Sequence, residues 1–132
     1  MKILIMGLPG SGKTTLATEL CKQIGAQHLN ADAIRTEYND WDFSAEGRKR
    51  QAERMGRLAS LSSAYYVIAD FVAPTHEIRN IYKADYTVWV DTIVEGRFAD
   101  TNTIFEKPLM YDLRVTSQNA EHWAKVIAKD LG

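Results

Sequence analysis

The stretch GLPGSGKTT, Gly7 to Thr15, follows directly on the short apolar run ILIM and precedes a segment with helical spacing of apolar residues. It fits the spacing G-x-x-x-x-G-K-[ST] of a phosphate-binding loop, or P-loop. The glycines permit backbone conformations that turn successive N–H groups toward one point, and the following helix adds the positive end of its dipole. The stretch therefore predicts a strand, a loop that binds the phosphates of a nucleotide, and a helix.

The loop also predicts which cofactors the chain uses. Lys13 is expected to reach the β- and γ-phosphates of ATP, and the Thr14 hydroxyl is expected to ligate Mg²⁺. The residues expected to bind the nucleotide are Gly7, Leu8, Pro9, Gly10, Ser11, Gly12, Lys13, Thr14 and Thr15.

The rest of the chain alternates buried-type strands with helical segments. Strands are predicted over residues 2–6, 26–30, 65–70, 86–91 and, more weakly, 109–115; helices are predicted over 14–24, 32–38, 44–64, 76–82 and 119–131. Such alternation implies βαβ units. The fold class predicted is therefore α/β, a P-loop NTPase of the nucleoside- or nucleotide-kinase-like kind: a three-layer sandwich around a mainly parallel five-stranded sheet.

Length and composition restrict the alternatives. With 132 residues, the chain is expected to form a single domain over residues 1–132. Its formal charge of −1 argues against a nucleic-acid partner. The single cysteine, Cys21, excludes a disulfide framework and is interpreted as an inert, buried thiol. Because no apolar run approaches membrane-spanning length and the N-terminus does not resemble a secretory leader, the expected location is cytoplasmic, without a membrane partner.

Three carboxylates follow predicted strands, at the edge where α/β sheets bind ligands. Asp70 ends YYVIAD and has the form of an acid that holds Mg²⁺, with a turn or capping role as the alternative. Asp32 is a candidate acceptor for the proton of a substrate hydroxyl, or a cap of the helix that it begins. For Asp91 a structural role at the next turn is favoured.

The long helical segment 44–64 carries a basic stretch, RKRQAERMGR, behind a plausible cap at Ser44. At about 100° per residue, its apolar face contains Ala52, Met55, Leu58 and Ala59. Arg50 and Arg57 then point to solvent, whereas Arg48 and Gln51 point inward. An inward arginine requires a partner, which is either an anionic ligand or an internal carboxylate. Trp41 and Phe43, just before this helix, offer aromatic surface for a base or for the core.

Taken together, GLPGSGKTTLA, LNADAIR, DFSAEGR and ADFVAP resemble the adenylylsulfate kinase family over roughly residues 1–97. That family typically shows a GLSGSGKST loop, LDGDNVR, GFSxxDRxENIRR and FISP. The resemblance implies an ATP- and Mg²⁺-dependent transfer of a phosphoryl group to the 3′-hydroxyl of adenosine 5′-phosphosulfate, in sulfate assimilation.

The same resemblance assigns residues. Asp32 is expected near the acceptor hydroxyl and acts in catalysis with Lys13 and Arg97. The residues expected to bind the acceptor are Asp32, Arg35, Phe43, Arg48, Gln51, Val72, Ala73 and Phe105, and those expected to hold metal are Thr14 and Asp70. Phe43 would stack on the adenine. Arg54 corresponds to the second arginine of NIRR.

The chain also departs from the family pattern. Asn30 replaces the first acid of LDGD, Ala73 the serine of FISP, and His76 an arginine two residues past that motif. After Arg97 the basic DPKGLYKKAR segment is absent, so residues 97–110 form only a short lid-like segment, in which Lys107 is the candidate compensating cation. Two other hypotheses stay open: a P-loop kinase for another hydroxyl acceptor (a nucleoside, a sugar acid or a polynucleotide end), and a non-catalytic ATP-binding module. The expected partner is a small nucleotide, and a homodimer is left open.

Overall fold

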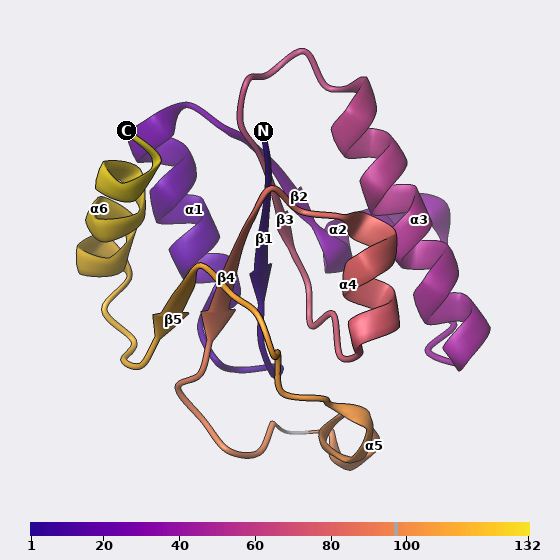
Figure 1. The fold of residues 1–132 in the computed structure, drawn as a ribbon. Coiled ribbons are helices and arrows are strands. Elements are labelled where there is room, and N and C mark those ends of the chain that lie inside the picture. Colours follow the sequence, from indigo (N-terminus) through magenta and orange to yellow (C-terminus); the bar gives the residue numbers. More distant parts are fainter. Residues whose placement is uncertain (97) are drawn as a thin grey trace.

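The chain folds around one five-stranded sheet, seen from the side in Figure 1. The computed structural model describes residues 1–96 and 98–132. The sheet has the order β2-β3-β1-β4-β5, and every pairing in it is parallel. The strands are β1 (Lys2–Met6), β2 (Gln27–Asn30), β3 (Val67–Asp70), β4 (Tyr86–Val90) and β5 (Leu113–Val115). The predicted α/β class and the five strands are confirmed, and β3 and β5 are shorter than expected.

Helices cover both faces of the sheet, as Figure 1 shows, and a separate apolar core fills each side. Helices α1 (Lys13–Ile24) and α6 (Ala120–Leu131) pack on one face, with Ile3, Ile5 and Ile68 of the strands between them and the sheet. On the other face α2 (Ala31–Tyr38), α3 (Ala45–Leu61) and α4 (His76–Tyr82) pack over Leu4, Met6 and Ala69. Because alternate strand residues point to opposite faces, these strands read as continuous apolar runs in the sequence.

The helix ends follow local capping chemistry. Ser44 caps α3 through the N–H of Gly47, and Gly25 ends α1 in a left-handed conformation, both as the sequence predicts. The cap of α2 differs from the prediction. Asn30 accepts the N–H of Ala33, so α2 begins one residue earlier than expected and Asp32 lies inside its first turn rather than at its cap.

One element has no counterpart among the predicted ones. Helix α5 (Ala99–Ile104) lies at the carboxyl ends of the strands, in the segment predicted to be a short lid. Its sequence, ADTNTI, carries no apolar period, so no pattern indicates a helix there. Among the described residues, no helix combines the length and the apolar character that crossing a bilayer requires.

Candidate active site

The P-loop connects β1 to α1 at the carboxyl edge of the sheet. Gly7, Gly10 and Gly12 have φ values of 155°, 88° and 101°, which side chains rarely adopt. A Cβ atom at Gly7 would lie 2.5 Å from the carbonyl oxygen of Val90 at the end of β4. The loop therefore requires glycine at Gly7 both for its backbone conformation and for close packing against β4.

Two side chains from distant loops hold the P-loop in place. The Thr92 hydroxyl donates to the Ser11 carbonyl at 2.7 Å, and the Gln118 amide donates to the Gly10 and Ser11 carbonyls at 3.3 and 3.2 Å. Both residues lie far from the loop in sequence, so no local motif predicts them. These contacts satisfy the Gly10 and Ser11 carbonyls and attach the P-loop to the segments that follow β4 and β5.

The predicted metal-binding residues lie next to each other. Asp70 ends β3 and is 2% exposed, and Thr14 is in the first turn of α1. Burial alone would raise the pKa of the Asp70 carboxyl. Hydrogen bonds from His28, Asn30 and Thr14 and the charge of Lys13 outweigh it and hold that pKa below its ordinary value. A carboxylate and a hydroxyl are the hard oxygen donors that Mg²⁺ prefers, with phosphate oxygens and water as its further ligands. The donor set therefore fits the metal, although the described residues contain no cluster of three or more His, Cys, Asp or Glu side chains that would hold an ion by themselves.

One cavity of about 860 Å³ joins the P-loop to the predicted acceptor site. That volume suits a small-molecule ligand pair. Of the predicted site residues, those that line it are Pro9, Gly10, Gly12, Lys13, Thr14, Thr15, Asp32, Arg35, Phe43, Arg48, Gln51, Asp70, Val72 and Ala73. The P-loop, the α2–α3 region and the segment after β3 thus face the same space.

Two arginines and an aromatic ring form the far wall of this cavity. The Arg35 guanidinium carbon lies 4.3 Å and that of Arg48 5.4 Å from the centroid of the Phe43 ring. Phe43 is 49% exposed and Trp41 is 50% exposed, so neither ring is buried in the core. This wall combines positive charge with an exposed aromatic face.

Neither of these arginines forms an ion pair with a carboxylate among the described residues. Arg35, 4% exposed, donates to the backbone carbonyls of Asp40 and Asp42 at 2.8 and 3.2 Å. Arg48 donates to the Phe43 carbonyl at 2.9 Å and contacts the Thr101 hydroxyl at 3.5 Å. Burial lowers the pKa of the Arg35 guanidinium, although the nearby charge of Asp40 acts to raise it. Burial also lowers the pKa of Arg48. Of the two partners predicted for an inward Arg48, no internal carboxylate forms an ion pair with it within the described chain, although the charge of Asp100 acts on it and opposes the effect of burial on its pKa.

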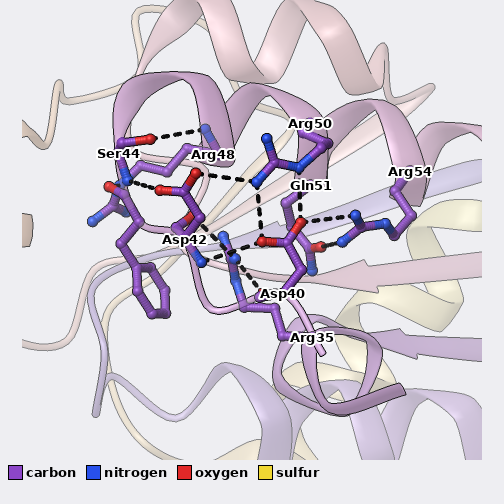
Figure 2. Close-up of polar contacts among 10 residues, drawn as sticks. Arg35, Asp40, Asp42, Ser44, Arg48, Arg50, Gln51 and Arg54 are labelled. Carbon is purple, nitrogen blue, oxygen red and sulfur yellow. Dashed lines mark hydrogen bonds and ion pairs between the residues drawn. The ribbon is translucent and has the colours of Figure 1, made fainter. Parts of the chain in front are cut away.

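The nearby carboxylates are instead bound by other arginines (Figure 2). Asp40 accepts from Arg50 at 2.8 and 3.0 Å and from Arg54 at 2.8 Å, and Asp42 accepts from Arg50 at 3.1 Å. Arg54 also donates to Gln51, whose amide reaches the Ala31 carbonyl. This network fixes the connection between α2 and α3, and with it Phe43. Arg50 is exposed as helix geometry predicts, but it folds back onto Asp40 rather than pointing freely into solvent.

The network predicts a loss of stability in acid. Hydrogen bonds from Arg50, and then from Arg54, hold the pKa of the Asp40 carboxyl well below its usual range, and hydrogen bonds from Ser44 lower the pKa of Asp42. A carboxyl whose pKa is lower in the folded than in the unfolded chain stabilises the folded state at pH values above its unfolded-chain pKa of about 4. This stabilisation is lost as the pH falls toward the pKa of the carboxyl in the folded chain. The free energy of unfolding, measured by denaturant titration from pH 6 to pH 3, should therefore decrease. Asp40→Asn should show a smaller decrease; equal decreases in both proteins would contradict the prediction.

The segment that follows position 97 is attached to α4. Arg79 donates to the Ala73 carbonyl at 2.8 Å and to the Glu106 carbonyl, while the Glu106 N–H donates to the Pro74 carbonyl at 2.7 Å. Ala73 is fully buried at a φ of 47°, a strained conformation that these contacts hold at the cavity wall. Helix α5 thereby reaches the rim, where Asp100 and Thr101 line the cavity.

The structure places the remaining predicted residues as follows. Phe105 packs against the α3–α4 side of the core and under the Arg79 guanidinium, and it is not among the residues that line the cavity. Asp91 forms an ion pair with Arg114 at 2.6 Å, a structural role as expected, although by bridging to β5 rather than by capping. Cys21 is half-buried, and burial followed by the charge of Asp70 raises the pKa of its thiol. The predicted catalytic Arg97 lies outside the described residues.

A parallel sheet of this order with a P-loop between its central strand and first helix defines an α/β P-loop NTPase. The model of the AAA domain family AAA_33 matches residues 3–97, and the chain belongs to this family.

Relatives of known name are kinases. The chain is 35% identical over 89 residues to the adenylyl-sulfate kinase of Bacillus licheniformis. This alignment covers 61% of the chain but only 45% of that relative. It is 26% identical over 133 residues to shikimate kinases of Haemophilus influenzae, covering 94% of the chain and 74% of the relative. Its fold matches the APS kinase of Mycobacterium tuberculosis in complex with AMPPNP and APS, with a TM-score of 0.87 at 20% identity over 98% of the chain and 96% of that structure.

These findings confirm the predicted resemblance to adenylylsulfate kinases and the predicted P-loop NTPase fold. They also support the class of the protein, a phosphotransferase of the P-loop kinase type that uses ATP. The shikimate kinases align with more of the chain, whereas the adenylyl-sulfate kinase is more identical within a shorter region. The identity of the acceptor is therefore a separate question.

Proposed function

We propose that this chain is an adenylylsulfate kinase: it transfers the γ-phosphoryl group of ATP to the 3′-hydroxyl of adenosine 5′-phosphosulfate. The products would be 3′-phosphoadenosine 5′-phosphosulfate and ADP. The observation that carries the proposal is the cavity wall of Arg35, Phe43 and Arg48, in which two half-buried or buried cations that form no ion pair with a carboxylate among the described residues border an exposed ring. Unpaired buried charge is costly, so such a wall favours an anionic ligand.

The acceptor's chemistry matches each part of this wall. Adenosine 5′-phosphosulfate carries a planar base for the Phe43 face and a doubly anionic group for the two guanidinium groups. Trp41, Gln51, Val72 and Ala73 line the same space and would complete the site. The chain's shortened lid-like segment removes basic residues, but Arg48 remains in contact with it through Thr101.

On the donor side, the P-loop N–H groups and Lys13 would hold the β- and γ-phosphates of ATP. Thr14 and Asp70 would hold Mg²⁺, whose contribution in such a site is to neutralise charge on the phosphate oxygens. The acceptor oxygen would attack the γ-phosphorus as the bond from that phosphorus to the bridging oxygen of ADP breaks. Asp32, which lines the cavity between the two sides, would receive the proton of the hydroxyl. Arg97 would act in catalysis, as the resemblance implies.

Residues 1–132 would together form a single phosphotransfer domain.

A second candidate is a kinase for a small hydroxylated acid. The near full-length alignment with shikimate kinases favours it, and one arginine would suffice to bind a carboxylate. The two candidates differ at Phe43, because an acid without a planar base gains little from an exposed aromatic ring.

The test is an acceptor panel with ATP and Mg²⁺ that contains adenosine 5′-phosphosulfate, shikimate, gluconate and a nucleoside. We expect turnover with adenosine 5′-phosphosulfate alone. Arg48→Gln should raise the KM for this acceptor about tenfold to hundredfold, as for loss of a charge-assisted contact of about 1.5–3 kcal/mol, and leave the KM for ATP unchanged. The matched control is Arg57→Gln, at an exposed position of the same helix.

Transfer to shikimate and none to adenosine 5′-phosphosulfate would establish the second candidate instead. If Arg48→Gln leaves the acceptor KM unaltered, Arg48 does not bind the anionic group of the acceptor, and the proposal is contradicted.

A further inference from the structure

Three chain segments bring four polar side chains to one point beside the P-loop. Asn30 and Asp70 are register partners at the ends of the parallel neighbours β2 and β3, so their side chains point to the same face of the sheet. The Asn30 amide nitrogen lies 3.0 Å from the Asp70 carboxylate and 3.3 Å from the Thr14 hydroxyl. His28, two residues before Asn30 and on the same face, completes the group at 3.1 Å from Asp70.

The hydrogen bonds fix the orientation of the Asp70 carboxylate. His28 Nε2 and Asn30 Nδ2 both contact the same oxygen, Oδ2, so rotation of the carboxylate would break two contacts at once. The Asn30 amide is itself fixed, because its oxygen accepts the N–H of Ala33 at 2.9 Å as the cap of α2. Its nitrogen is therefore directed at Asp70 and Thr14, and the oxygen cannot replace it there without loss of the cap.

This group carries one formal negative charge from Asp70 in a nearly inaccessible place. The Asn30 amide and the Thr14 hydroxyl carry no charge, so they stabilise the Asp70 carboxylate without cancelling it, and its charge is available to attract a cation at the adjacent Thr14 hydroxyl. In the LDGD pattern that LNAD resembles, an acid occupies the position of Asn30. In this chain the neighbouring strand supplies the carboxylate instead, and position 30 supplies an amide.

We propose that Asn30 and His28 are positioning residues for the metal-binding carboxylate of Asp70, and that this carboxylate is exchangeable between positions 30 and 70. One charge next to Thr14 is what the site requires, and either of the two register partners can carry it while the other supplies the hydrogen bond. The inference rests on the proposed function only in that the site binds a metal–ATP complex. It does not depend on the acceptor.

The exchange is tested by calorimetric titration of ATP into protein with Mn²⁺ as the probe metal and, separately, with EDTA. Asp70→Asn is expected to weaken binding of Mn²⁺–ATP at least tenfold, with little change for ATP in EDTA. The double variant Asn30→Asp/Asp70→Asn, which moves the carboxylate to the other strand, is expected to recover most of that affinity.

A double variant that binds Mn²⁺–ATP no better than Asp70→Asn would overturn the exchange, as would parental affinity in Asp70→Asn. These measurements contain no acceptor, so they are independent of whether adenosine 5′-phosphosulfate is the substrate.

A second arm leaves Asp70 in place and tests its orientation. His28→Leu is expected to weaken Mn²⁺–ATP binding about tenfold, in the range found when a partner that orients a metal ligand is lost, without an effect on ATP in EDTA. His28→Gln, which keeps a hydrogen-bond donor, is expected to recover part of it. Equal affinities for His28→Leu and the parent would show that His28 does not position the carboxylate. Because this arm does not alter the buried charge, it decides the role of His28 even if Asp70→Asn does not fold.

Discussion

Lys13→Ala is expected to lower the turnover number about a thousandfold. Lys13 begins α1 and lines the cavity beside Thr14, with its ammonium group 3.2 Å from the Leu8 carbonyl. Its charge is placed where negative charge develops on the phosphoryl group in transit, and loss of one such group typically costs two to five orders of magnitude in rate, about 10²–10⁵. Steady-state assays with the preferred acceptor measure the change.

The control for this variant is Lys22→Ala, an exposed lysine near the other end of the same helix. This variant should retain the turnover number of the parent. Without nucleotide, both variants should have melting temperatures close to that of the parent. ATP should raise the melting temperature of the parent by linkage, and less so that of Lys13→Ala. If the parent has no turnover above Lys13→Ala with any acceptor, the chain is a non-catalytic ATP-binding module, the remaining hypothesis from its sequence.

Asp32→Asn is expected to lower the turnover number by about 10²–10⁴-fold, the usual contribution of general acid–base catalysis. The carboxylate lies in the first turn of α2, lines the cavity and is the candidate to receive the acceptor proton. The amide has nearly the same shape but cannot take up a proton. The KM for ATP should hardly change, because the donor phosphates are held by the P-loop.

The structural cost of this substitution should be small. Asn30 supplies the cap of α2, and removing one negative charge from the first turn of a helix costs about 0.3–1 kcal/mol. Glu37→Gln, at an exposed position on the same helix, serves as the control. Turnover of Asp32→Asn within threefold of the parent would exclude Asp32 as the proton acceptor and make Asp100, which lines the cavity and whose charge acts on Arg48, the next candidate.

The sequence predicts features that depend on neighbours along the chain. The strand, glycine loop and helix around Lys13 are local, and so is the inward direction of Arg48 and Gln51, which follows from the helical angle alone. Capping by Ser44 and termination at Gly25 are likewise local hydrogen-bond and backbone effects. These features were sufficient to predict the fold class correctly and to name candidate residues for the ATP site.

Other features arise from contacts between segments far apart in sequence. Thr92 and Gln118 support the P-loop, and Arg79 attaches Glu106 to α4. None lies in a motif. The sequence offers Asp32 as one candidate cap of α2, but Asn30 caps this helix, because both residue types cap helices and only the backbone decides between positions two residues apart.

By itself, the sequence determined a P-loop, a parallel α/β sheet and a set of candidate residues for a kinase, because these depend on short-range spacing and periodicity. Only the tertiary structure decided how charges pair. It paired Asp40 and Asp42 with Arg50 and Arg54, left Arg35 and Arg48 facing the cavity without an ion pair to a carboxylate among the described residues, and brought Asn30 and Asp70 together across two strands. The physical reason is that ion pairs and hydrogen bonds depend on distances of a few ångströms in space, which sequence separation does not report.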